Sequence, residues 1–530
     1  MRDIVLLGLG LLWMVALLSA LADRWRISTP IFLVMGGLIA SLIPGVPPIR
    51  IDPDLIFQVF LPPLLFNAAW FTSWRELWRY RRIILVLAFG LVILTATAVA
   101  YTATNLIPGF SLSLGFLLGG LVSPPDAIAA TSVLQSVKAP KSTIAILEGE
   151  SLINDAASLI VLRFALASVI TGTTAWTDVI HSFFSITILG AGVGVTVAGA
   201  FYAIQRWLPL QLRVSILLTF LAPYSMYLIA EQLQYSGIIA VVSGGLFLSK
   251  NSHTVHLHSE RIQSNAMWAT LIYIINGLVF MLIGLELPIV LEGLTNYSLV
   301  DITGYALLIT ALVISVRLGF AFISTAFTRI AERFITVAVR NASWRGPFVV
   351  GWAGMRGVVS LAAAFSIPLT LPNDAPFPHR PLLLFITFVV IMVTLVLQGL
   401  TLPWVVSWVH PQEQINRIPE HEQRNQINRQ LHGAALRELI RNYTTQISDN
   451  PLLGQLKSHL ETNLLLSEMP KSEKNDQWFA MYKEALMQVY QIRRQELAQL
   501  RLQPDLDEEV IRKIEAQLDF EEEQIERPIS

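Results

Sequence analysis

The amino-acid sequence predicts an all-α polytopic membrane protein with a helical cytoplasmic tail. The first observation is composition: of 530 residues, 54% are hydrophobic and 14% are charged, whereas soluble domains have about 45–50% apolar and about 25% charged residues. The second is a succession of apolar stretches long enough to cross a bilayer. The third is an uneven distribution of Lys and Arg among the loops. Together they predict about thirteen transmembrane helices. Interruptions in two of these spans, described below, predict inverted repeats with two broken helices that cross at the midplane.

The apolar stretches set the number of expected spans, because a helix needs about 20 apolar residues to cross the hydrocarbon core. The first stretch lacks a small-residue cleavage site, so we expect a retained helix and not a signal peptide. By this criterion there are thirteen candidate spans, of which the ninth is short: residues 4–22, 29–46, 54–72, 83–105, 111–136, 143–171, 180–204, 213–232, 235–249, 266–292, 302–327, 346–371 and 381–409.

Basic residues are concentrated in the loops that follow odd-numbered spans. Those loops hold 16 Lys and Arg, whereas the N-terminus and the other loops hold three; Arg163, Arg317 and Arg356 lie inside spans. Cytoplasmic loops carry the excess of basic residues in membrane proteins. The asymmetry therefore supports thirteen spans, with the N-terminus outside and the tail in the cytoplasm. We expect this multi-pass protein to lie in the lipid bilayer of the plasma membrane.

The charge balance divides the chain near residue 410. Residues 1–410 carry 22 basic and 17 acidic side chains, whereas residues 411–530 carry 15 and 21. We expect residues 1–410 to form the transmembrane domain and residues 411–530 a cytoplasmic regulatory tail, whose partner the sequence does not identify. No basic run is interleaved with aromatic residues, which argues against a nucleic-acid partner. The lack of Cys excludes disulfides and Cys-based metal centres.

Polar side chains interrupt the fifth and sixth spans. The fifth contains Ser123-Pro124-Pro125-Asp126, where two prolines cannot continue a regular helix. The sixth carries two sets of polar residues. At about 100° per residue, Glu148, Ser151 and Asp155 share one face, while Glu150 and Asn154 lie on the adjoining face. Ionisable groups inside a span are costly unless paired or hydrated, so each is a functional candidate.

The depth of these groups points to one site. A rise of about 1.5 Å per residue puts Asp126, Asp155, Arg317 and Arg356 about 15–20 Å from the cytoplasmic ends of their spans. The twelfth span has its own breaker pattern, residues 351–357, with glycines flanking Arg356. It lies seven spans after the fifth and so runs in the opposite direction. Two opposed broken helices are typical of inverted-repeat transporters with a site at the midplane.

Several of these polar residues also have structural interpretations. We expect Glu150 to form a buried ion pair with Arg317 or Arg356, because an unpaired buried arginine is costly. Glu148 is nearer the cytoplasmic end and lines the entrance, and Arg163 lies outside the site, where it snorkels or pairs locally. A solvated loop explains the histidines at positions 253, 256 and 258 better than a pH sensor or a metal site does.

Five motifs, in this order and at these spans, resemble the monovalent cation/proton antiporter family of the NhaP and sodium/proton exchanger type over residues 1–410. The resemblance implies a homodimer in which each protomer has a dimerisation domain and a mobile six-helix core, with no cofactor and no enzymatic activity. The motifs are Leu61-Pro62-Pro63-Leu64-Leu65-Phe66, Ser123-Pro124-Pro125-Asp126, the run Glu148 to Asp155, Phe280-Met281-Leu282-Ile283-Gly284-Leu285, and Gly354-Met355-Arg356-Gly357.

The resemblance also implies roles for single residues. Asp155 is similar to the aspartate that alternately binds proton and cation, with Asn154 as its fixed neighbour. Asp126 and Ser151 are similar to further Na⁺ ligands, and Glu150 is similar to the acid of the arginine pair. Several relatives have an acid near the ion site where this chain has Asn67, whose amide can still offer an oxygen.

The sequence thus predicts a secondary active antiporter that exchanges Na⁺, or Li⁺ or K⁺, for H⁺ by alternating access at a buried aspartate. Exchange is expected to be electroneutral, one cation for one proton. A cation channel, or a membrane sensor that uses the tail, is the alternative. A proton-pumping subunit of a redox complex would have lysine relays within its spans, and no lysine lies in any predicted span.

Overall fold

The computed structural model of the chain is helical throughout, apart from loops and one isolated β-bridge between Thr370 and Pro376 in the part that it describes. It divides into two compact units, unit 1 with residues 1–414 and unit 2 with residues 415–530. The described residues are 2–25, 29–43, 56–137, 139–172, 176–255, 258–294, 297–331, 343–372, 374–411, 420–468, 473–500, 510–511, 514–515, 517–519 and 521–522.

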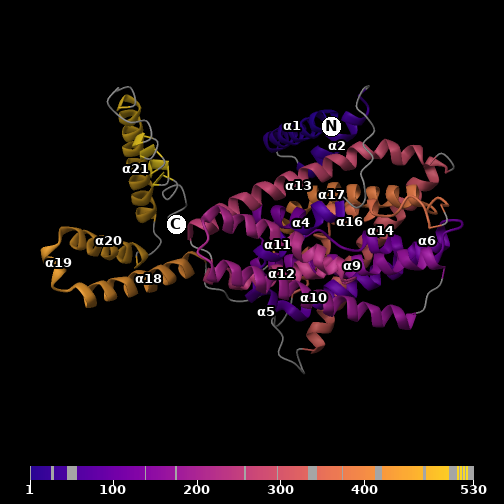
Figure 1. Ribbon diagram of the computed structural model, residues 1–530, viewed down its shortest axis with the longest axis horizontal. Helices are drawn as coiled ribbons and strands as arrows, with labels where there is room; N and C mark the ends of the chain where they lie inside the picture. Colours follow the sequence, from indigo (N-terminus) through magenta and orange to yellow (C-terminus); the bar gives the residue numbers. More distant parts are fainter. Residues whose placement is uncertain are drawn as a thin grey trace. The chain divides into compact units, whose positions relative to one another are not determined.

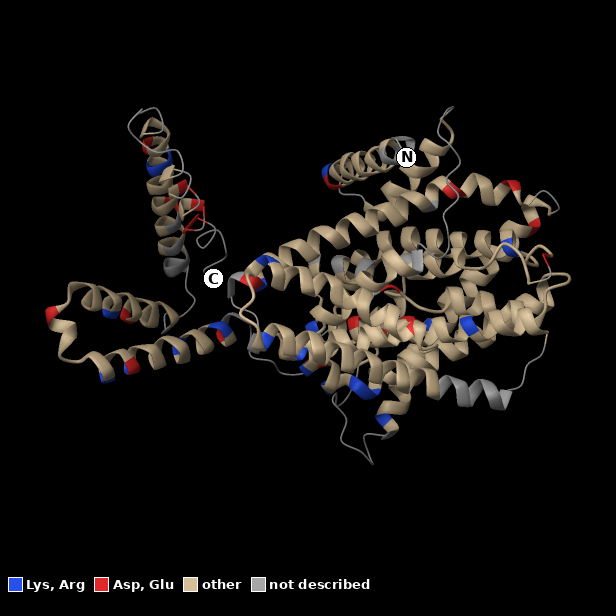
Figure 2. Cartoon of the chain, in the orientation of Figure 1, with Lys and Arg blue, Asp and Glu red and all other residues tan. Residues whose placement is uncertain are grey.

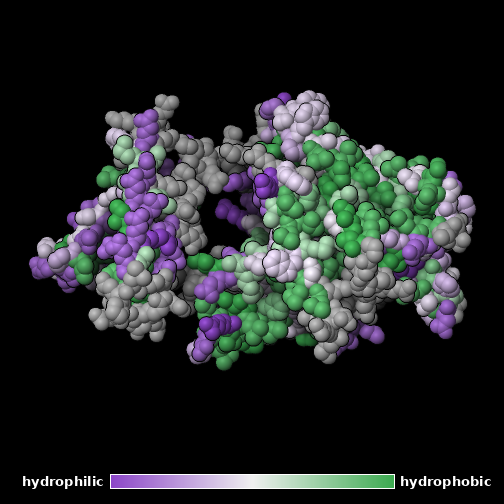
Figure 3. All heavy atoms as spheres, turned by 90° about the horizontal axis from the view of Figure 1, so that it is seen from above, coloured by the Kyte–Doolittle hydropathy of each residue, from purple (hydrophilic) through white to green (hydrophobic). Residues whose placement is uncertain are grey.

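The surfaces of the two units differ in polarity. Hydrophobic residues cover most of the visible face of unit 1, whereas hydrophilic residues predominate on unit 2 (Figure 3). Within unit 1, charged positions are sparse along the helices, and several of them lie at helix ends (Figure 2). Glu150, Arg317 and Arg356 are buried in its interior. An apolar outer surface around a few interior charges is the arrangement expected of helices surrounded by lipid.

The helices of unit 1, labelled in Figure 1, form two bundles by their contacts, with many contacts inside each bundle and few between them. Bundle A contains α5 (Trp74–Leu85), the π-helical segment η2 (Val86–Leu91), α6 (Val92–Leu106), α7 (Leu112–Val122), α8 (Ala127–Ser136), α9 (Lys141–Thr171), α14 (Leu299–Ala331), α15 (Arg345–Trp352), α16 (Val358–Phe365) and α17 (Arg380–Val409).

Bundle B is held together by close approaches of helix backbones. A Cβ added at Gly37 of α2 or at Gly284 of α13 would collide with the backbone of the other helix, so small residues permit this packing. The bundle contains α1 (Arg2–Trp25), α2 (Thr29–Ser41), the π-helical segment η1 (Ile56–Phe60), α4 (Leu61–Phe71), α10 (Trp176–Trp207), α11 (Leu212–Gln232), α12 (Gly237–Val255) and α13 (His258–Glu292).

Both predicted helix breaks are present. The fifth predicted span is the pair α7 and α8, separated by residues 123–126, and the twelfth is the pair α15 and α16, separated by residues 353–357. Pro124 and Pro125 lack the amide hydrogens that would continue α7. In the second break, Gly357 has an extended backbone (φ −138°, ψ −156°) and begins a new helix.

The predicted all-α membrane fold is confirmed. Every predicted span overlaps a helix or a helix pair, and the fourth is part of a longer helix that runs from Trp74 through η2 to Leu106. Among the described residues, eight helices are long and apolar enough to cross a membrane, and Thr29–Ser41 and Leu112–Val122 are shorter apolar helices. Thirteen crossings remain a prediction.

Unit 2 is a group of polar helices. The helices α18 (Glu420–Tyr443) and α20 (Pro451–Glu468) pack together as a hairpin around the short α19 (Gln446–Asp449). The helix α21 (Glu473–Leu500) holds part of the C-terminal segment through ion pairs, with Arg493 2.7 Å from Glu521 and Arg494 2.5 Å from Glu522. Hydrogen bonds from Arg494 keep the pKa of Glu522 below its ordinary value.

Candidate functional site

A cavity of about 190 Å³ lies where the two bundles meet. Bundle B supplies one wall from α4 and Asn276 of α13, and bundle A supplies the other from the first break, α8, α9 and α16. Apolar side chains such as Leu64 and Phe71 make up part of the lining. The polar residues that line it are Asn67, Thr72, Asp126, Thr131, Glu148, Ser151, Asp155 and Asn276.

The helix α9 presents two different faces at this point. Glu148, Ser151 and Asp155 all line the cavity and are partly exposed to it. Glu150 and Asn154 belong to the adjoining face and are 1% and 0% exposed. The separation follows from the helical period, because residues three, four and seven positions apart lie on the same side of a helix.

Two aspartates meet in the cavity from different elements. Asp126 ends the first break, directly before α8, and Asp155 lies in the middle of α9. Both residues line the same cavity. Together with the hydroxyls of Ser151 and Thr131 and the amides of Asn67 and Asn276, they supply the oxygen ligands that a hard cation prefers.

The two breaks touch each other beside Asp126. The backbone amide of Asp126 donates a 2.7 Å hydrogen bond to the carbonyl of Met355 in the second break. A Cβ added at Gly357 would collide with the carboxylate of Asp126. Only a glycine therefore allows the second break to approach this carboxylate so closely, and the cavity is built at the crossing of the two broken helices.

Arg356 stabilises this crossing through carbonyl groups. Its guanidinium donates hydrogen bonds to the carbonyls of Val122 (3.0 Å), Ser123 (3.4 Å) and Gly354, and it is fully buried. Val122 and Ser123 end the helix α7, whose last carbonyls have no partner within the helix. A cation at this helix end satisfies those groups and offsets the negative end of the helix dipole.

Arg317 of α14 is the arginine that binds Glu150. Its two terminal nitrogens donate to the two carboxylate oxygens of Glu150 at 2.6 and 3.1 Å, and one of them also donates to the carbonyl of Val350 at 3.2 Å. The side chains are 2% and 1% exposed. This bidentate pair joins α14, α9 and α15. The sequence predicted these helices to be neighbours only because their ionisable residues lie at a similar depth in the membrane. Gly354 leaves space for it, since a Cβ there would collide with Arg317.

Comparison with known proteins identifies the family. The family described as "Sodium/hydrogen exchanger, transmembrane" matches residues 11–408. The chain belongs to the sodium/hydrogen exchanger family. It is therefore a membrane-embedded Na⁺/H⁺ antiporter, a transporter and not an enzyme, and antiporters of this family need no cofactor.

The similar proteins carry related names. An uncharacterised Na⁺/H⁺ exchanger of Mycobacterium tuberculosis is 30% identical over 98% of this chain and 97% of its own length. A sodium, potassium, lithium and rubidium/H⁺ antiporter of Bacillus subtilis is 33% identical over 76% of this chain and 61% of its own length. The solved sodium proton antiporter MjNhaP1 of Methanocaldococcus jannaschii matches with a TM-score of 0.58 and 18% identity, over 77% of this chain and 100% of its own; this likeness concerns the fold.

Other predicted residues of the exchanger lie outside the cavity. Asn154 is fully buried, and neither atom of its amide has a hydrogen-bond partner among the described residues. Arg163 pairs with Glu231 of α11 at 2.6 Å, which connects bundle A to bundle B. His256 lies outside the described residues, as do the side chains of His253 and His258.

Sequence reasoning missed polar residues of the cavity that carry no charge. Asn276 of α13 and Thr131 of α8 both line it, and each stands inside a predicted span. Neither residue belongs to one of the five motifs or to the polar set of the sixth predicted span, where the other candidates lie. A polar residue in the middle of an apolar span was the available signal for Asn276.

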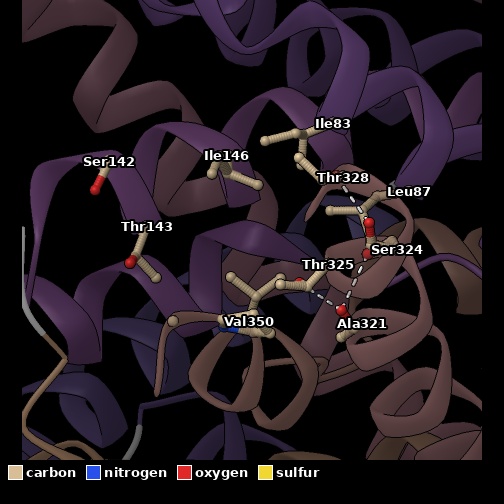
Figure 4. A pocket seen from close by; sticks show the side chains of 12 residues that line it. Ile83, Leu87, Ser142, Thr143, Ile146, Ala321, Ser324, Thr325, Thr328 and Val350 are labelled. Carbon is tan, nitrogen blue, oxygen red and sulfur yellow. Dashed lines mark hydrogen bonds between the residues drawn. The ribbon is translucent and has the colours of Figure 1, made fainter. Parts of the chain in front are cut away.

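A second, smaller cavity of about 50 Å³ lies within bundle A, between α9, α14, α15 and the junction of α5 with η2 (Figure 4). No acidic or basic side chain lines it. The hydroxyls of Ser324, Thr325 and Thr328 donate to carbonyls of their own helix, at 2.8–3.0 Å. The second cavity therefore offers an ion no charged ligand.

Proposed function

We propose that the exchanger moves one Na⁺ against one H⁺ by alternate occupation of Asp155. A proton and a monovalent cation each neutralise the same carboxylate, so the binding of one displaces the other. Asp126, Ser151 and Asn67 are the further oxygen ligands of the cation, and Asn154 is the fixed neighbour of Asp155. The observation that carries this proposal is the cavity between the bundles, where two aspartates from different elements lie together.

The arginines have a supporting role in this proposal. Glu150 stays locked to Arg317, because both of its oxygens accept hydrogen bonds from that side chain. Arg356 holds the two breaks together through backbone carbonyls. Neither group then exchanges a proton during the cycle, and Asp155 remains the carboxylate that titrates.

Alternating access requires that one bundle move against the other. Bundle A carries Asp126 and Asp155, bundle B supplies the opposite wall of the cavity, and few contacts join the two. We infer that bundle A carries the ion while bundle B forms a homodimer with a second copy, as the family resemblance implies. In the cell, the exchanger lies in the plasma membrane with its N-terminus outside and residues 411–530 as a cytoplasmic regulatory tail.

Proton movement in everted membrane vesicles tests the proposal. After a proton gradient has been established, NaCl, LiCl and KCl are added in turn and the internal pH is followed with a fluorescent dye. We expect Na⁺ to dissipate the gradient with a saturable concentration dependence. The printed name of the Bacillus subtilis relative includes potassium and lithium, which supports testing those ions too. A response to none of them, or a flux that never saturates, would contradict the proposal.

A further inference from the structure

The helix α5 begins the longest span of bundle A with a strongly basic segment. The span runs from Trp74 to Leu106 over 33 residues, and its first twelve residues read WRELWRYRRIIL, with four arginines and one acid. The side chain of Ser73 caps this helix by accepting a hydrogen bond from the backbone amide of Glu76. Because the arginines follow directly on a stable helix start, their side chains are presented from a fixed backbone.

One face of α5 is packed against the helix that carries the ion site. Tyr80 and Ile84 are 1% and 0% exposed. The Cδ1 atom of Ile84 fills the space beside Gly149, where an added Cβ would lie 2.5 Å from it. Gly149 stands between Glu148 of the cavity face and Glu150 of the ion pair. A displacement of α5 would therefore be transmitted to α9 at the level of the site.

The opposite face of α5 is aromatic and cationic. Trp74 and Trp78 are exposed, and their rings stack at a centroid distance of 6.0 Å. The guanidinium of Arg81 lies 4.6 Å from the ring centre of Trp78, and the ammonium of Lys250 lies 5.6 Å from that of Trp74. Arg75 and Arg79 are exposed on the same helix. We call Trp74, Arg75, Trp78, Arg79, Arg81 and Lys250 the α5 surface.

The α5 surface belongs to both bundles. Five of its residues stand on α5 of bundle A, whereas Lys250 stands on α12 of bundle B. The contact of Lys250 with Trp74 therefore bridges the boundary that must shift if one bundle moves against the other. A ligand that binds this surface would contact both bundles together.

We propose that the α5 surface binds the headgroup of an anionic phospholipid and that this lipid tunes the rate of exchange. Tryptophan rings favour the membrane–water interface, arginine forms bidentate hydrogen bonds with phosphate, and clusters of basic residues beside a span attract anionic lipids. The lipid joins bundle A to bundle B through the arginines of α5 and Lys250. This proposal goes beyond ion exchange, because binding at the α5 surface does not depend on which ion occupies the cavity.

Charge complementarity favours a lipid over the acidic tail of the same chain. Glu521 and Glu522 are the described members of the acidic run in the tail, and both are already ion-paired, with Arg493 and Arg494. The surrounding bilayer, by contrast, presents phosphate groups at the level where a span leaves the hydrocarbon core. The tail is therefore the alternative that the experiment must exclude.

Lipid binding is measured on the full-length protein in detergent by native mass spectrometry, with phosphatidylglycerol titrated in. We compare the wild type with the double variant Arg75→Gln/Arg79→Gln. The matched control is Arg24→Gln/Arg213→Gln, which removes the same charge from exposed positions of bundle B. We expect phosphatidylglycerol affinity to fall about fivefold for each arginine removed from α5, and the control to keep most of the affinity. A variant with Arg75→Lys/Arg79→Lys should retain part of the binding.

Exchange is then measured in vesicles of phosphatidylcholine with and without phosphatidylglycerol. We expect phosphatidylglycerol to change the Na⁺-driven proton flux of the wild type and of the control but not that of the α5 variant, whose flux in pure phosphatidylcholine should match the wild type. Equal lipid binding by the α5 variant and the wild type would overturn the proposed site. An affinity for uncharged diacylglycerol equal to that for phosphatidylglycerol would also overturn it. So would displacement of the lipid by a synthetic peptide covering residues 519–526, because the tail would then be the preferred occupant. Lost binding with an unchanged lipid response would overturn the regulatory role.

Discussion

The two faces of α9 carry similar polar side chains into opposite surroundings. On one face, Asp155 and Glu148 line the cavity between the bundles. On the other, Glu150 is closed off from solvent, and both of its oxygens are engaged by Arg317. Residue type does not distinguish these carboxylates, since all three are acids in one span. Their surroundings do.

The difference teaches which carboxylate is able to exchange its partner. A group that borders a cavity can bind a proton or a cation in turn, because water and ions reach it. A group that is bidentate to a buried arginine would have to leave an uncompensated charge behind, which costs several kcal/mol. The packed face of α9 therefore stabilises the bundle, and we propose that the cavity face takes part in transport.

The largest expected effect is on the cavity face. Replacing Asp155 with Asn removes the charge that proton and cation share, so we expect Na⁺-driven proton movement in vesicles to fall to background. The protein should remain folded, because the aspartate borders a cavity and is not part of the Glu150–Arg317 pair. A detergent melting curve like that of the wild type is the control. Persistent exchange by the Asn variant would refute the assignment of Asp155.

On the packed face the expected effect is on stability. Replacing Arg317 with Ala strands Glu150 without a partner, and we expect a loss of about 3–5 kcal/mol, measured as lowered thermal stability in detergent. Glu150→Gln in the same background should restore part of the loss, giving a strongly non-additive double-mutant cycle. Arg356→Ala with Glu150→Gln is the matched comparison, and its losses should be closer to additive because Arg356 donates to carbonyls. An additive cycle for Arg317 would contradict the pair.

A smaller effect is expected at the pair that joins the two bundles. The side chains of Arg163 and Glu231 are 41% and 31% exposed, so the pair is partly solvated. Arg163→Gln should lower stability by about 0.2–1 kcal/mol, and the difference should shrink at high salt. Thermal melting of variant and wild type at low and high ionic strength measures both. A loss of stability as large as that of Arg317→Ala would show that burial does not account for the different contributions of the two ion pairs.

The sequence predicted relations within a helix better than contacts between helices. The helical period placed Glu148, Ser151 and Asp155 on one face, and the prolines and glycines located both breaks. The sequence left open whether Glu150 pairs with Arg317 or Arg356. The two arginines lie at similar depth, and only tertiary packing decides which one reaches α9. For the same reason, no spacing predicts that Arg356 binds carbonyls that end α7.

Asn154 shows a further limit of prediction from the sequence. The resemblance implied a fixed polar neighbour for Asp155, and the helical period correctly separated the two faces. Nothing in the sequence predicts that both amide atoms of Asn154 are buried without a hydrogen-bond partner among the described residues. Such a group costs about 1–3 kcal/mol, and a cost of this kind depends on side chains contributed by other helices.

The smallest expected effect is that of membrane potential on the exchange rate. From the comparison of the two faces of α9, we expect the potential to have no effect. Asn154 is uncharged and Glu150 is held by Arg317. In the proposed cycle Asp126 is a fixed ligand of the cation, which leaves Asp155 as the carboxylate that exchanges its proton. Each cycle then moves one cation one way and one proton the other, without net charge. In proteoliposomes whose potential is clamped with K⁺ and valinomycin, and with K⁺ transport measured in parallel, the initial Na⁺-driven proton flux should be the same at every potential. A flux that changes systematically with potential would mean that a second carboxylate also takes up and releases a proton. Asp126 would be that carboxylate, because it meets Asp155 in the same cavity, and Asp126→Asn should then abolish the voltage dependence of whatever exchange remains.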